Sequence, residues 1–121
     1  MPNPAPGFLR HPHHTITIAP PARLSVHING TLIAKSVAAR QLQEDGYPPR
    51  AYIPAADIFA TLERTQRTTH CPFKGDTQYF DVSISGQTFE NAAWCYPAPF
   101  DEMAAIEGHI AFDDRFEFSE T

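Results

Sequence analysis

The chain has 121 residues, the size of one domain, and a formal net charge of −5 at pH 7. Its nine Lys and Arg residues are scattered and outnumbered by 14 acidic residues, so we expect no nucleic-acid partner. No apolar run is long enough to span a bilayer, and the start of the chain lacks the apolar segment of a secretory signal. We therefore expect no membrane partner and a cytoplasmic location, in which the two cysteines stay reduced.

Half of the 12 prolines fall within the first 21 residues, which predicts a Pro- and His-rich N-terminal arm over residues 1–23. Proline fixes φ and removes an N–H group, so the arm is expected to be extended and either to lie along the domain or to stay loose. Only residues 15–18 alternate like a strand. The arm contains His11, His13 and His14, but a short histidine tract lacks the spacing of a structural metal site. We predict no metal and no cofactor.

Residues 24–121 show the alternation of a β domain, beginning with Leu24, Val26 and Ile28 on one face of a strand. Asn29 and Gly30 tolerate positive φ, so they predict a tight hairpin into the following strand.

Later segments continue this pattern. Residues 52–53 are predicted to form a strand, and residues 54–62 a short helix. Residues 79–84 and 87–95 are predicted to form a second hairpin. Residues 101–107 predict helical turns ended by Gly108, followed by short strand segments near the C-terminus. The expected fold is one small, mainly antiparallel β domain with one or two short helices.

Two polar and aromatic clusters indicate a site. The first, at residues 67–79, contains Arg67, His70, Cys71, Lys74, Asp76 and Tyr79, and the second, at residues 91–99, contains Trp94, Cys95 and Tyr96. Because the clusters are one hairpin apart, we expect them to meet across neighbouring strands. From these clusters we take six ligand-binding candidates: Arg67, His70, Lys74, Tyr79, Trp94 and Tyr96.

Each candidate also has a structural interpretation. Lys74 either faces an anion beside the turn at Gly75 or is a solvated lysine paired with Asp76. Cys71 is either a nucleophile or a buried structural thiol, and His70, as the adjacent residue of an extended chain, points to the opposite face. The aromatic residues either line a pocket or fill the core.

Several ordered motifs resemble one known family. Residues 52–57 (Tyr-Ile-Pro-Ala-Ala-Asp), 71–75 (Cys-Pro-Phe-Lys-Gly) and 92–97 (Ala-Ala-Trp-Cys-Tyr-Pro) are similar to the pattern of the domain of unknown function family 427, over roughly residues 24–117. The resemblance implies a compact tent- or barrel-like β fold of the Mss4-like kind. The family is sometimes labelled a nucleotidyltransferase group. That chemistry would need paired carboxylates, whereas Asp76 and Asp81 have an odd spacing on a strand.

Two functions remain open. The first is a binding module that holds a small anionic ligand, with Lys74 and Arg67 beside the aromatic residues. The second is an enzyme that acts in the same pocket, with Lys74 or Cys71 as the reactive group and Asp76 or His70 orienting it. A nucleotide-like molecule is one possible substrate class for such an enzyme. We prefer the first, because the sequence supplies anion-recognising groups without an activated nucleophile. The sequence is compatible with either a monomer or a homodimer.

Overall fold

Strand β3 (Thr31–Glu44) is the longest element, and three other strands pair with it. β2 (Ala22–Ile28) reaches it through the predicted turn, where Asn29 and Gly30 have φ of 49° and 80°. β1 (Ile16–Ile18) and β4 (Arg50–Pro54) both pair with Leu42, so they lie on opposite edges of β3.

The remaining strands complete one sheet. They are β5 (Thr61–Cys71), β6 (Gly75–Ile84), β7 (Gln87–Cys95), β8 (His109–Phe112) and β9 (Glu117–Ser119). The computed structural model describes residues 2–121. Eight of its nine strands follow the order β5-β6-β7-β8-β4-β3-β2-β9, and the ninth, β1, pairs with β3. Every strand pair is antiparallel. The predicted mainly β antiparallel fold and both hairpins are confirmed.

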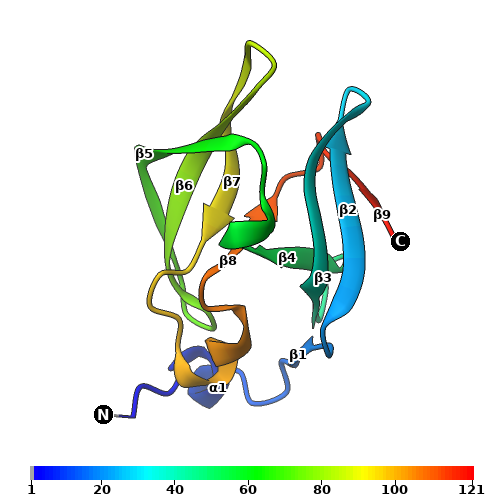
Figure 1. The fold of residues 1–121 in the computed structure, drawn as a ribbon. Coiled ribbons are helices and arrows are strands. Elements are labelled where there is room, and N and C mark those ends of the chain that lie inside the picture. The colour runs from blue at the N-terminus through cyan, green and yellow to red at the C-terminus, as the bar shows by residue number, and fades with distance from the viewer. Residues whose placement is uncertain (1) are drawn as a thin grey trace.

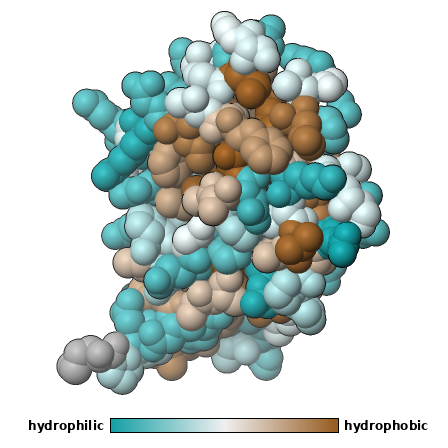
Figure 2. All heavy atoms as spheres, in the orientation of Figure 1, coloured by the Kyte–Doolittle hydropathy of each residue, from teal (hydrophilic) through white to brown (hydrophobic). Residues whose placement is uncertain are grey.

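The sheet bends so that two hairpins stand beside each other. Figure 1 shows β6 and β7 on one side and β2 and β3 on the other, with both turns at the same end of the molecule. β4 and β8 connect the two sides. Apolar side chains gather over the space between the hairpins (Figure 2).

The helical segments are short: α1 (Gly7–Arg10), η1 (Ala55–Asp57) and η2 (Asp101–Ile106). The helix predicted over residues 54–62 is wrong beyond Asp57. The chain becomes extended at Ile58, which bridges to Ala34, and the N–H of Phe59 donates to the carbonyl of Ile33 over 2.7 Å. Pairing with β3 therefore overrides the local helical pattern. Within residues 2–121, no helix is long and apolar enough to cross a membrane.

Two apolar clusters form the core. The larger lies between the hairpins and includes Val26, Ile33, Ile53, Val82 and Phe112. The smaller includes Leu42, Tyr52, Tyr96, Met103 and Ile106, and Phe8 of the arm packs against it. The second cluster positions the site described below.

The N-terminal arm lies along the domain and contains one helical turn, α1, where extended backbone was predicted. Its N–H groups donate to three partners: Asn3 to Asp101 Oδ2 over 2.7 Å, Ala5 to Glu102 Oε1 over 2.9 Å, and Gly7 to the Pro72 carbonyl over 2.9 Å. Ala5 and Gly7 are buried. The arm is thereby attached to η2 and to the turn between β5 and β6.

Candidate functional site

A cavity of about 350 Å³ opens where the ends of β3, β4, β5, β6 and β7 converge. Its lining residues are Leu42, Glu44, Tyr47, Pro48, Arg50, Tyr52, Cys71, Lys74, Tyr79, Trp94 and Tyr96. The chain has four tyrosines and one tryptophan, and all five line this one cavity.

Strand alternation explains how these side chains come together. Arg50 and Tyr52 are two residues apart on β4, so they share a face. Trp94, near the end of β7, and Tyr96, directly after the strand, have the same spacing. Tyr79 of β6 is directly opposite Trp94 in the ladder, and the two ring centroids are 6.4 Å apart. Neighbouring strands therefore present one aromatic wall.

Lys74 enters the cavity from the turn between β5 and β6. Its backbone N–H donates to the Cys71 carbonyl over 3.3 Å, and its own carbonyl accepts from the Phe100 N–H over 3.0 Å. The next residue, Gly75, has φ of 124°, and a Cβ there would be 3.2 Å from the Ala98 carbonyl oxygen. Glycine is needed at this position to direct the chain into β6.

The Lys74 ammonium is paired inside the protein. Its Nζ donates to Glu44 Oε1 over 2.5 Å, and the two side chains are only 10% and 11% exposed. Nζ is also 4.0 Å from Cys71 Sγ. Of the two sequence interpretations of Lys74, the solvated pair with Asp76 does not occur, because Glu44 is the partner.

His14 brings the arm into the same network. Its Nε2 lies 2.8 Å from Glu44 Oε2, and because an ionised carboxylate only accepts hydrogen bonds, Nε2 carries the proton. The imidazole packs on the ring of Phe73, with centroids 4.3 Å apart. Glu44 therefore joins the arm to Lys74.

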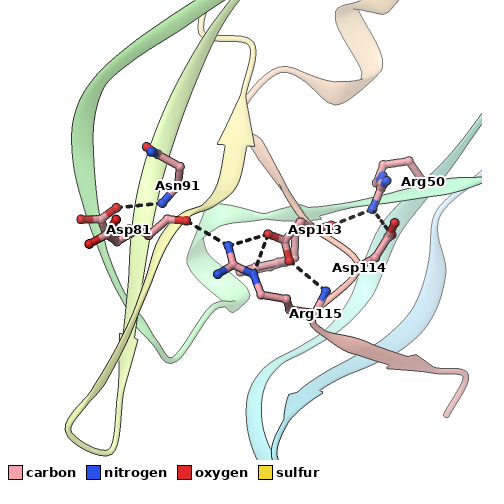
Figure 3. Close-up of polar contacts among 8 residues, drawn as sticks. Arg50, Asp81, Asn91, Asp113, Asp114 and Arg115 are labelled. Atoms are coloured by element: carbon pink, nitrogen blue, oxygen red, sulfur yellow. Dashed lines mark hydrogen bonds and ion pairs between the residues drawn. The ribbon is translucent and has the colours of Figure 1, made fainter.

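Arg50 contributes a second cation to the wall. Its guanidinium lies over the Trp94 ring, 5.1 Å from the centroid. The same group donates to the Phe112 carbonyl over 2.9 Å and to Asp114 over 3.1 Å (Figure 3). These contacts hold Arg50 at the edge of the cavity.

Burial sets the ionisation of two phenols. It raises the pKa of Tyr52 above its ordinary value of 10.0, and it raises the pKa of Tyr96 still more strongly. Both side chains are therefore neutral hydroxyls at physiological pH. The charged groups of the lining are Arg50, Lys74 and Glu44.

A family model described as domain of unknown function (DUF427), with the model name NTP_transf_9, matches residues 17–120. The chain belongs to this family. No curated protein matches the chain. The family description names no activity, so the function must be argued from the site itself.

This DUF427 chain brings most of the predicted site residues together. Lys74, Tyr79, Trp94, Tyr96 and Cys71 all line the cavity. They come from both sequence clusters, as expected from hairpin geometry.

The other three candidates lie elsewhere. Arg67 stacks on the Tyr79 ring, 4.6 Å from its centroid, and is absent from the cavity lining. His70 Nδ1 and Asp76 Oδ1 pair at 2.7 Å, with side chains 57% and 87% exposed, on the wall of a separate cavity. Within residues 2–121, no side-chain hydrogen bond or ion pair links His70 or Asp76 to Lys74 or Cys71.

Asp76 and Asp81, the two carboxylates considered for magnesium, each have a hydrogen-bond partner in the protein: Asp76 pairs with His70, and Asp81 binds a backbone N–H group. Asp81 accepts the backbone N–H of Asn91 over 2.8 Å (Figure 3), at a bulge in β7 where Asn91 has φ of 49°. Thr65 donates to the Asn91 side chain over 2.7 Å. In the chain from residue 2 onward, no group of three or more His, Cys, Asp or Glu is arranged to hold a metal ion.

Five further residues belong to the site and lie outside the two sequence clusters: Glu44, Tyr47, Arg50 and Tyr52 line the cavity, and His14 contacts Glu44. A usable signal existed for Arg50 and Tyr52, whose spacing before Pro54 places them on one face of a predicted strand. No local signal pointed to Glu44, because its partner Lys74 is 30 residues away.

Proposed function

We propose that this DUF427 domain binds a small anionic ligand that also has a flat unsaturated group. The main support is that all four tyrosines and the only tryptophan line one cavity. Tyrosine and tryptophan combine an apolar ring with a polar handle, which suits contact with flat, polar molecules. A concave aromatic site with a few convergent polar groups is the usual form of a ligand pocket.

Charge favours an anion. The lining has two cations, Arg50 and Lys74, against one carboxylate, Glu44. The other carboxylate near Arg50 belongs to Asp114, whose side chain is 89% exposed, so solvent screens that pair strongly. One positive charge in the cavity is thus left without a buried partner.

Size limits the ligand. A volume of about 350 Å³ is near the lower end for small-molecule sites. A ligand with one or two rings and one acidic group fits these limits.

Unpaired cysteines are typical of a reducing compartment, so we propose that this binding takes place in the cytoplasm.

Naphthalene-2-sulfonate is a suitable probe, because its charge stays constant at all working pH values, and naphthalene-2-sulfonamide is its neutral counterpart. Trp94 is the only tryptophan, so a ¹H–¹⁵N spectrum contains one indole N–H signal, and that signal reports on the cavity. We expect a saturable shift with the sulfonate and about tenfold weaker binding of the sulfonamide, as for loss of a charged hydrogen bond.

Two arginine variants test the location. Arg50→Gln should reduce sulfonate affinity toward that of the sulfonamide, because it removes a cation from the wall. Arg64→Gln is the matched control, since Arg64 is exposed and lines the separate cavity beside His70. Equal affinities for the charged and neutral probes, or equal losses in the two variants, would disprove the anion site.

A second candidate function is an enzyme that uses Cys71 or Lys74, for instance on a nucleotide-like substrate. The observation in its favour is the 4.0 Å contact between Cys71 Sγ and Lys74 Nζ on the cavity wall, because a neighbouring cation stabilises a thiolate. Cys95 serves as an internal reference, since burial raises the pKa of its thiol. Stoichiometric alkylation by iodoacetamide that is much faster at Cys71 than at Cys95 would favour the enzyme, and equal slow rates would exclude a cysteine nucleophile.

A further inference from the structure

A continuous chain of contacts runs from the N-terminal arm into the cavity. His14 Nε2 is 2.8 Å from Glu44 Oε2, and Glu44 Oε1 is 2.5 Å from Lys74 Nζ. The side chains of His14, Glu44 and Lys74 are 19%, 11% and 10% exposed. Each oxygen of the Glu44 carboxylate thus has its own donor, one from the arm and one from the cavity wall.

The arm holds His14 in place from several sides. The imidazole packs on Phe73 of the turn that carries Lys74. The next arm residue, Thr15, donates its N–H to Asp45 Oδ2 over 2.8 Å, and its carbonyl accepts from the Asp45 N–H over 3.1 Å. These contacts fix the distance between the imidazole and the end of β3.

Without the His14 donor, one oxygen of a nearly buried carboxylate would have no protein partner. An unpaired buried acceptor is costly, so Glu44 would turn toward water and move away from Lys74. With His14 present, Glu44 occupies one of the three N–H donors of the ammonium. The other two remain available toward the cavity, in which Cys71 makes only a long contact.

We infer that His14 is a positioning residue of the anion site and that the N-terminal arm forms part of that site. The inference rests on the proposed function, because it assigns Lys74 to the anion. It adds His14 and the other arm residues that precede the family match, which begins at residue 17. The arm acts on the ligand only through Glu44 and Lys74.

Two variants separate the hydrogen bond from the packing of His14. His14→Gln keeps an N–H donor near the position of Nε2, whereas His14→Met has similar length and no donor. Both lose the imidazole that packs on Phe73. A difference between the two variants therefore reports on the hydrogen bond to Glu44.

The first measurement needs no ligand. The chain has two lysines, and Lys35 is exposed on β3, so it serves as an internal reference for acetylation by an N-hydroxysuccinimide ester. We expect the ratio of Lys74 to Lys35 acetylation to rise about fivefold in His14→Met, because an ammonium that Glu44 no longer holds turns out of the cavity into solvent. The ratio should stay near the wild-type value in His14→Gln.

The second measurement is the affinity for naphthalene-2-sulfonate. His14→Met should bind it about tenfold more weakly, and His14→Gln should recover most of that loss. An unchanged or lower acetylation ratio in His14→Met, or equal affinities in the two variants, would overturn the inference. If the wild-type protein does not bind the sulfonate, the proposed function and the anion-site role of His14 both fail. In that case the acetylation ratio still decides whether His14 positions Lys74.

Discussion

The pair formed by Lys74 and Glu44 predicts a strong energetic coupling between two residues that are 30 positions apart. Removing one partner of a fully buried ion pair costs about 3–5 kcal/mol. This pair is 10% and 11% exposed and borders an open cavity, so we expect Lys74→Met and Glu44→Gln each to cost about 2–3 kcal/mol. For a chain of 121 residues, that lowers the melting temperature by about 8–12 °C.

The double variant distinguishes a direct interaction between the two charges from two independent losses of stability. With neither charge present, the loss of stability should be about that of one single variant and not the sum of both, because two neutral groups of similar volume replace a pair that was costly to desolvate. The coupling free energy from the cycle of Lys74→Met and Glu44→Gln should be about 1.5–3 kcal/mol. Sulfonate binding should stay weaker than in the wild type, since the Lys74 ammonium is gone and only Arg50 remains.

Chemical denaturation of the wild type, both single variants and the double variant measures this coupling. The exposed pair of His70 and Asp76 is the control, and Asp76→Asn should change the free energy of unfolding by less than about 0.5 kcal/mol. If the effects of Lys74→Met and Glu44→Gln add within about 0.5 kcal/mol, then the two charges do not interact, and the ion pair on which the site depends is disproved.

Three further predictions concern the arm and the ionisable groups. Gly7→Ala should weaken arm docking and lower the melting temperature, because a Cβ there would come within 2.7 Å of the Phe73 ring; an unchanged melting temperature would contradict this. Burial raises the pKa of Tyr52 and Tyr96 above 10.0, so the free energy of unfolding should fall as pH rises past about 10. Absorbance at 295 nm should then show both phenols ionising together with unfolding. Hydrogen bonds from the arm lower the pKa of Asp45 below 3.8, so the stabilisation that they provide is present at neutral pH and should disappear as pH falls through that lowered pKa. A stability difference between wild type and Asp45→Asn that persists at lower pH would oppose this last expectation.

The sequence predicted the parts of the fold that depend on neighbouring residues. Asn29 with Gly30, and Ser85 with Gly86, specify tight turns because these residues accept positive φ, and the structure has it at all four positions. Alternation on either side of each turn then sets which side chains share a face. For this reason the meeting of the two motif clusters, with Tyr79 beside Trp94, was predictable from hairpin geometry alone.

Local patterns failed where a distant segment decided the outcome. Residues 58–62 have apolar side chains at helical spacing, but pairing of Ile58 and Phe59 with β3 makes them extended. Similarly, Asp76 is the nearest carboxylate to Lys74 in the sequence, yet Asp76 pairs with His70 at the separate cavity.

Turn chemistry and side-chain alternation act over a few residues, so they were enough to predict a small antiparallel β domain, its two hairpins and the aromatic motifs of one cavity. The charged network, which places His14, Glu44 and Lys74 in contact, could be found only in the folded chain. These residues come from the arm, the end of β3 and the turn after β5. Their meeting depends on how the sheet bends and where the arm docks, and no local pattern encodes that arrangement.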